Sequence, residues 1–204
     1  MLMFSLFSKS HRRGFTLVEL VVVMAIFTIM TIVVMANLPA FRSRTSLDLL
    51  AEEVAITIRQ AQVFGVGTRV FETEFPSYGV YFSIDPQSFV LFGDSDGDNT
   101  YDVPTELREQ FQFRGGVGIT ELEGCYNSDC SSLIDLPTLE ILFHRPEADA
   151  SFGSNGVPLD PSPSYVRITL SSVNNPTDGQ RYVIVWNTGH IYACNPILNP
   201  TSCS

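Results

Sequence analysis

The sequence predicts an α+β protein: one long N-terminal helix, membrane-spanning in its first half, whose second half packs on antiparallel β-sheet. Three observations support this prediction. Residues 15–36 are apolar, residues 47–61 carry apolar side chains at helical spacing, and short alternating runs separated by turns follow residue 68. The expected segments are a basic leader (1–14), a membrane-spanning helix half (15–36), an amphipathic helix half (37–65) and an extracytoplasmic β-rich domain (66–204).

The apolar run is long enough to cross a bilayer. As a helix, residues 15–36 extend roughly 33 Å at 1.5 Å per residue. Their many Val and Ile residues form helices poorly in water, but lipid forces the backbone to bond to itself. Thr28 and Thr31 are expected to bond back to preceding carbonyls. Because the positive charges precede the span, we expect the N-terminus inside the cytoplasm and the domain outside.

Glu19 is the only ionisable side chain between Phe15 and Phe41. A carboxylate at the centre of a membrane helix costs ~2.5–3.5 kcal/mol on insertion scales, so Glu19 needs a partner. A cut between Gly14 and Phe15 would create a positive α-amine four residues away. Glycine suits that position because a peptidase must approach the backbone closely.

The residues around this junction resemble the class III signal of type IV pilins and type II secretion pseudopilins. The matching residues are Arg12, Arg13, Gly14, Phe15, Thr16, Leu17, Glu19 and Leu20. The resemblance implies that prepilin peptidase cleaves after Gly14, that Phe15 is N-methylated, and that Glu19 forms a salt bridge with the new amine during filament assembly. The alternative is an ordinary signal anchor with an accidental Glu.

The resemblance also implies partners and a location. The partners are other pilin or pseudopilin subunits, prepilin peptidase, an inner-membrane assembly platform and membrane lipid. The implied location is the inner membrane, crossed once with the N-terminus inside and the domain periplasmic or extracellular, and then the filament. Sequence alone leaves open a type IV pilus subunit or a pseudopilin of a type II secretion filament.

The charge disfavours nucleic acid as a partner. The chain has 12 basic and 22 acidic side chains, a formal charge of −10. Loss of the leader removes Lys9, Arg12 and Arg13, which leaves nine basic side chains and a charge of −13. Phosphate binding needs clustered Lys and Arg, which such a domain lacks.

The helix is expected to continue beyond the membrane and to end near residue 65. Leu47, Leu50, Val54, Ile58 and Ala61 recur at intervals of three and four, which indicates an amphipathic helix. The glycines at positions 65 and 67 supply a stop. Proline at position 39 lacks a backbone donor, so we expect a kink or local loosening there.

Strand and turn signals fill the rest of the chain. Tyr78–Ile84 and Ser88–Phe92 predict a hairpin with a turn at residues 85–87. Residues 145–164, with four Pro and two Gly, predict a long exposed loop. We expect Trp186 and the Phe residues to fill the sheet–helix core. Further strands are expected at Leu107–Phe113, Leu139–Phe143, Val166–Leu170, Tyr182–Trp186 and His190–Ala193, the last two joined by a tight turn at Asn187–Gly189.

Within the pilin family, three features resemble the GspH/FimT-type minor subunits. The first is the Arg-x-Ala-Gln helix end, Arg59 to Gln62. The second is a hairpin that runs into Phe92-Gly93-Asp94, and the third is a closing hairpin over residues 182–194. The resemblance implies a minor subunit.

Four cysteines lie outside the membrane segment, which favours disulfides in an exported domain. Three pairings are open, and we expect the local one, Cys125–Cys130 with Cys194–Cys203, because each pair lies in a loop rich in turn residues. Zinc is the alternative, but neither pair has the two-residue spacing typical of zinc sites.

An acidic loop follows the first hairpin. Asp94, Asp96, Asp98 and Asp102 stand at relative positions 1, 3, 5 and 9, as in calcium loops, and the Thr100 carbonyl would add a ligand. Glu106 falls one residue beyond the usual bidentate Glu. The sequence therefore predicts a Ca²⁺ site, with a solvated acidic turn as the alternative.

No recognisable catalytic motif accompanies these features. His144 and His190 are the only histidines after the leader, and neither belongs to a nucleophile, zincin or phosphate-loop pattern. We expect His144 to be structural, His190 to lie on the surface, and the protein not to be an enzyme. The remaining alternatives are a filament-tip module that binds DNA or a surface ligand, and a membrane-anchored hydrolase.

Overall fold

The computed structural model describes residues 14–67, 76–85, 87–103, 105–113, 116–172, 179–196 and 203. The chain divides into two compact units, Met1–Pro39 and Ala40–Ser204, which are described separately. The basic leader residues and Pro86 of the predicted turn lie outside the described residues.

The first unit holds the start of the helix α1 (Leu17–Val66). Its large apolar side chains between Leu17 and Met35 are 51–79% exposed. By length and composition this helix is able to cross a membrane. The hydroxyls of Thr28 and Thr31 donate to the carbonyls of Met24 and Phe27, at 2.7 and 2.8 Å, as expected. The helix does not end at position 39 but runs on into the second unit.

In the second unit, the predicted stripe of α1 is buried. Its five residues, Leu47, Leu50, Val54, Ile58 and Ala61, are at most 5% exposed. The helix ends at Val66, where the amide of Gly67 donates to the carbonyl of Val63 at 2.9 Å. The predicted helix end is therefore confirmed.

The strands form two antiparallel sheets rather than one. The first sheet has the order β3-β2-β1-β6-β7-β8 and the second β11-β10-β9-β4-β5. The first contains β1 (Ser77–Ser83), β2 (Ser88–Asp94), β3 (Leu107–Gln112), β6 (Thr138–Phe143), β7 (Ala150–Ser154) and β8 (Val157–Pro158). The second contains β4 (Val117–Cys125), β5 (Leu133–Asp135), β9 (Tyr165–Ser172), β10 (Gln180–Trp186) and β11 (Ile191–Cys194).

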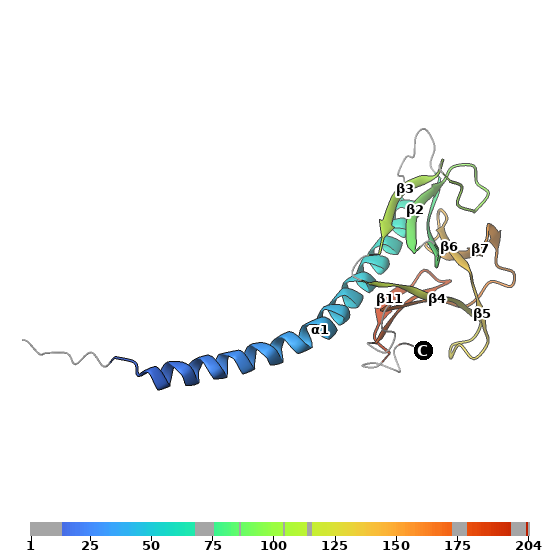
Figure 1. Cartoon of the computed structure of the whole chain (residues 1–204). Helices are drawn as coiled ribbons and strands as arrows, with labels where there is room; N and C mark the ends of the chain where they lie inside the picture. The colour runs from blue at the N-terminus through green and yellow to red at the C-terminus, as the bar shows by residue number, and fades with distance from the viewer. Residues whose placement is uncertain are drawn as a thin grey trace, which may run out of the picture. The chain divides into compact units, whose positions relative to one another are not determined.

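One apolar core joins the helix to both sheets (Figure 1). Side chains alternate along each strand, so every second residue faces this core. Val80 and Ile141 from the first sheet, and Ile168 and Val185 from the second, are all fully buried in it. The predicted fold class, one long helix packed on antiparallel β-sheet, is confirmed.

Residues 145–164 are not one long exposed loop, as the sequence had predicted. They contain β7 and β8, which pair with each other and extend the first sheet. Phe152 lies opposite Ile141 of β6 and is 3% exposed. All four prolines that suggested a loop lie outside β7, and Pro158 stands in β8 at the edge of the sheet, where proline is tolerated.

Trp186 does not fill the sheet–helix core, contrary to the sequence prediction. It lies at the end of β10, where Val183 and Val185 face the helix. The strand period of two therefore turns Trp186 to the opposite face, where it packs on Tyr165 and Ile184.

The helix end and the closing hairpin, two of the features that resemble minor subunits, bind each other. Arg59 Nη2 donates to the carbonyl of Ile191 at 3.1 Å, and Gln62 Nε2 donates to that of Gly189 at 2.8 Å. Gly189 has φ of 78°, which the tight turn between β10 and β11 requires. On the same side, Arg181 Nε donates to Asp48 Oδ1 at 2.5 Å.

At Gly65 the helix α1 lies in close contact with the backbone of β6. A Cβ at this position would lie 2.5 Å from the Phe143 carbonyl oxygen. Gly65→Ala should therefore lower the free energy of unfolding by about 1–3 kcal/mol, although alanine favours helices by ~1 kcal/mol. Urea unfolding of the detergent-solubilised full chain, followed by the fluorescence of its one tryptophan, measures this. Val63→Ala, at an exposed helical position, is the control and should change stability little.

Candidate functional site

The N-terminal signal leads directly into a capped helix. Gly14, Phe15 and Thr16 precede α1. The Thr16 hydroxyl oxygen accepts a hydrogen bond from the amide of Glu19 at 3.2 Å, and the Thr16 carbonyl accepts one from the amide of Leu20 at 3.2 Å. Thr16 is thus the N-cap, and Glu19 stands at the third helical position, as in a capping box.

This cap was not among the predicted site residues. The pattern Thr-x-x-Glu over residues 16–19 was the sequence signal that would have revealed it. The cap starts the helix beside the predicted cleavage point, and it places the carboxylate of Glu19 in the first turn, where the helix dipole favours a negative charge.

The acidic loop between β2 and β3 brings together carboxylates in two groups. In one, carboxylate oxygens of Asp94, Asp96 and Glu106 lie within 4.8 Å of one another. In the other, those of Asp96, Asp98 and Asp102 do so. Asp96 belongs to both groups, so the four predicted aspartates are joined to Glu106 in one continuous cluster.

Glu106 is the residue that the sequence reasoning set aside. It is 1% exposed, and its Oε1 accepts a hydrogen bond from the amide of Ser95 at 2.7 Å, while Oε2 accepts one from the amide of Asp102 at 3.0 Å. The loop folds back on itself, so position in a fixed calcium-loop register was a poor guide. Thr100 uses its hydroxyl and its amide to donate to Asp98 Oδ1, both at 2.8 Å.

Burial makes the negative charge of Asp94 costly. Asp94 is 3% exposed. Its pKa rises to about 6, first because burial disfavours the charge and then because Glu106 and Asp96 repel it. Hydrogen bonds from the amides of Gly97 and Asn99, at 2.8 and 3.3 Å, oppose the rise. The loop thus holds two buried carboxyl groups side by side.

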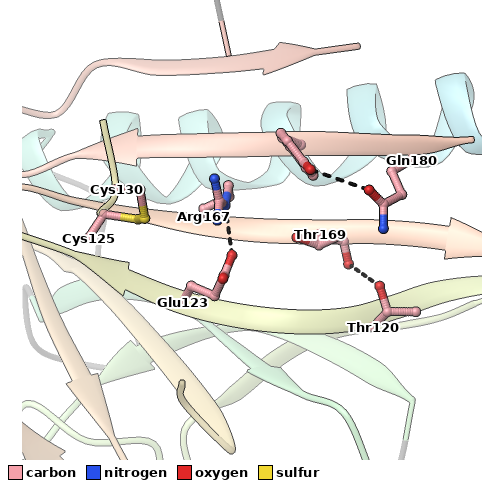
Figure 2. A network of polar contacts seen from close by, with 8 residues as sticks. Thr120, Glu123, Cys125, Cys130, Arg167, Thr169 and Gln180 are labelled. Carbon is pink, nitrogen blue, oxygen red and sulfur yellow. Dashed lines mark hydrogen bonds and ion pairs between the residues drawn. A yellow bond between two sulfur atoms is a disulfide. The ribbon is translucent and has the colours of Figure 1, made fainter. Parts of the chain in front are cut away.

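The outer face of the second sheet carries aromatic side chains and the ion pair of Arg167 with Glu123, which Figure 2 shows. Arg167 Nε donates to Glu123 Oε2 at 2.7 Å, and the guanidinium lies over the Tyr182 ring, 5.1 Å from its centroid. The Tyr165 and Trp186 rings are 4.7 Å apart. The hydrogen bond to the carboxylate raises the pKa of Arg167. These contacts fasten β4, β9 and β10 to one another.

The cysteines are joined locally, Cys125 to Cys130 and Cys194 to Cys203, with Cα–Cα distances of 4.9 and 5.8 Å. The first bridge closes a loop at the edge of the second sheet, beside the outer face just described (Figure 2). All four sulfur atoms are thus bonded, which leaves no thiolate for zinc.

His144 lies half-buried between two serines. Its Nδ1 is 2.8 Å from Ser77 Oγ and its Nε2 is 3.0 Å from Ser151 Oγ. The two hydrogen-bond partners of this ring are thus serine hydroxyls, one from β1 and one from β7. His190 is exposed, as expected.

Comparison with known proteins agrees with the N-terminal signal. Residues 9–35 match the family model of the prokaryotic N-terminal methylation motif. No curated protein matches the chain. Among solved structures, the chain is similar to the type IV minor pilin FimU of Pseudomonas aeruginosa (14% identity, 72% of this chain and 92% of that chain covered, TM-score 0.41).

The chain therefore carries an N-terminal methylation signal followed by a long helix that packs on antiparallel β-sheet. The match confirms the predicted N-terminal signal, and the structure confirms the predicted fold class.

The environment of His144 predicts an acid-sensitive contact. Burial lowers its pKa, so the folded protein binds this proton less readily than the unfolded chain, and stability should fall as pH drops below about 6.5. His144→Gln should reduce this loss, measured as the difference in melting temperature between pH 7.5 and pH 5.5. The exposed His190→Gln variant is the control, and an unchanged pH dependence in His144→Gln would contradict the prediction.

Proposed function

We propose that this protein is a minor pilin or pseudopilin, a structural subunit of a type IV pilus or type II secretion filament that is processed by prepilin peptidase. The observation that carries the proposal is the continuity of three parts. The methylation motif leads into an exposed apolar helix, and the same helix ends as the buried core element of a β-rich domain. The motif is the part that is processed. The exposed apolar half of the helix inserts into lipid or packs on other helices, and the buried half fixes the helix to its domain.

Processing begins at Gly14. Hydrolysis of the Gly14–Phe15 peptide bond releases the basic leader and leaves a protonated amine on Phe15. The open surroundings of Gly14 support access, since an added Cβ would meet no atom within 4 Å. In the methylation step this amine first loses a proton, and its lone pair then takes the methyl group from an electrophilic methyl donor, whose leaving group departs. The product is a protonated secondary amine, so the positive charge is kept.

After cleavage, Glu19 acquires its partner. Thr16 caps the helix and so holds Phe15 just before the first turn, in which Glu19 lies. The carboxylate can neutralise its own Phe15 amine or attract that of a neighbouring subunit. The attraction is stronger in a low dielectric than in water, although desolvation offsets part of it. Such a pair would set the axial position of one subunit against the next.

The second half of α1 offers a further packing surface. Leu49, Ile56 and Val63 are 67%, 57% and 67% exposed and are spaced by seven residues, so they form one stripe on the side away from the core. A stripe of this kind suits a neighbouring helix. It extends the apolar surface that the membrane half supplies, and we include it in the assembly contact.

The signal supports an inner-membrane precursor with its N-terminus in the cytoplasm and its domain outside. The positive charges before the span agree with this orientation. The disulfides agree with an oxidising compartment for the domain. The partners follow from the proposal: other subunits of the filament, prepilin peptidase, the assembly platform and membrane lipid.

Glu19→Val should separate processing from assembly. We expect cleavage after Gly14 to continue, since the scissile bond is untouched, and incorporation into filaments to fall at least tenfold because the amine loses its counter-ion. Mass spectrometry of the mature N-terminus and quantification of the subunit in sheared filaments measure the two steps. Glu52→Gln removes a charge elsewhere on α1 and serves as control. Normal incorporation of Glu19→Val, or a chain that starts at Met1, would refute the assignment.

Ile56→Gln tests the exposed stripe. The side chain is exposed, so the variant should keep the melting temperature of the parent in detergent. Its incorporation into filaments should fall several-fold, because the glutamine amide would be buried against a neighbouring helix without a matched partner. The control is Glu53→Gln, which changes an exposed side chain three residues earlier on the same helix. Equal incorporation of both variants would remove the stripe from the assembly contact.

A further inference from the structure

We propose that a groove between α1 and the end of β3 binds residues 41–44 of α1 from a second copy of this chain. The inference rests on the proposed assembly function and names one of its contacts. The groove lies where β3 runs beside the helix (Figure 1) and has a volume of about 490 Å³. Leu49, Leu50 and Glu53 line it from α1, and Phe111, Gln112 and Phe113 line it from the end of β3 and just beyond.

The walls of this groove are largely apolar. Phe111 lies on β3 and Phe113 just after it, and both rings pack against Phe89 of β2, with centroids 4.7 and 5.6 Å away. On the helix side, Leu49 is 67% exposed. In the described part of the chain, β3 is an edge strand of its sheet. An open groove of this size suits a large apolar side chain.

One negative charge stands at the edge of the groove. Glu53 is the one charged residue among those that line it, all of which the structure describes. Its side chain is exposed and forms no ion pair with any described residue. A complementary partner therefore carries a large apolar side chain with a positive charge beside it.

Residues 41–44 of α1 have this composition. Phe41 is 67% exposed, and it is the one exposed aromatic side chain among the described residues of the second unit. Arg42 and Arg44 are exposed and form no ion pair within the described part of the chain. Asp48, one turn beyond Arg44, is bonded to Arg181 instead. Phe41 and Arg44 are three residues apart, so they are neighbours on the helix surface.

The same spacing occurs in the groove. Leu50 and Glu53 are also three residues apart. Two parallel copies that are offset by nine residues, about 13.5 Å at 1.5 Å per residue, therefore bring Phe41 level with Leu50 and Arg44 level with Glu53. A single offset thus satisfies both the apolar contact and the ion pair.

The contact joins two different surfaces, so it builds a filament and not a closed dimer. Phe41 and Glu53 are 12 residues apart, which places them about 120° apart around the helix. Each copy can therefore give its residues 41–44 to one neighbour while its groove receives those of another. Because the copies are also offset along the helix, the repeat does not close into a ring. The pair of Glu19 with the Phe15 amine of another subunit needs an offset of only about four residues, so it joins a different neighbour.

Phe41 needs such a partner once the subunit leaves the membrane. It follows the apolar run by a few residues, so in the membrane-inserted precursor its ring lies near the lipid headgroups, where aromatic side chains are stable. Extraction into a filament removes that lipid. The groove of the next copy then supplies apolar surroundings for the ring.

Cysteine crosslinking in cells that assemble the filament tests the contact. The four native cysteines are paired, so a new thiol is reported without competition from them. Two full chains with different tags are produced together, one with Arg42→Cys and the other with Gln112→Cys. Mild oxidation should join them in a covalent dimer. Asp149→Cys, at an exposed position outside the groove, replaces Gln112→Cys in the control and should give none. No dimer, an equal dimer in the control, or a bond from Gln112→Cys to a different protein would overturn the proposal.

Charge reversal tests the offset between the copies. Arg44→Glu and Glu53→Arg should each lower incorporation into filaments several-fold, because like charges then meet. The double variant should restore incorporation to near the parent level. Within one helix the two positions are about 13.5 Å apart, so restoration reports a contact between copies. Glu53→Gln keeps an acceptor oxygen for Arg44 and should have little effect, since exposed ion pairs contribute little. A double variant no better than the single ones would contradict the contact.

Mass spectrometry of the mature N-terminus separates this contact from the assembly function. A parent chain that starts at Phe15 and enters filaments, but shows neither the dimer nor the restoration, would overturn the groove contact alone. A parent chain that starts at Met1 and enters no filament would overturn the assembly function, and the groove contact with it.

Discussion

The buried stripe of α1 is the contact on which the rest of the structure depends. Ile58 and its neighbours along the helix meet the inner faces of both sheets, so a single core holds strands of both sheets against one helix. Burial of each such side chain contributes roughly 1.5–3 kcal/mol. The same helix carries the signal at its other end.

The hydrogen bonds of the helix end explain why two distant sequence features occur together. Arg59 and Gln62 donate hydrogen bonds to carbonyl groups in and beside the turn between β10 and β11. Those carbonyls point away from the strand ladder and need donors. The Arg-x-Ala-Gln helix end and the closing hairpin thus form the two sides of one contact. Ala61, on the same part of the helix, is buried in the core.

Local patterns predicted most of the fold. The two wrong predictions, at β7 and at Trp186, concern features that long-range strand pairing decides. The hairpin of β1 and β2 follows from alternation on either side of a turn. By contrast, β7 was missed because its partner β6 is what makes Phe152 a core residue, and the prolines nearby suggested a loop. Trp186 was placed on the wrong face because aromatic character alone does not say which side of a strand is buried. The valines beside it, at positions 183 and 185, decide that.

The sequence by itself determined the signal, the long apolar run and the buried helix stripe. Each of these rests on residues close together in the chain, where spacing is set by the geometry of one element. Only the tertiary structure decided the composition of the acidic site. Glu106 reaches Asp94 because the loop folds back between β2 and β3. Contacts of that kind depend on sheet order, which the spacing of residues along the chain does not encode.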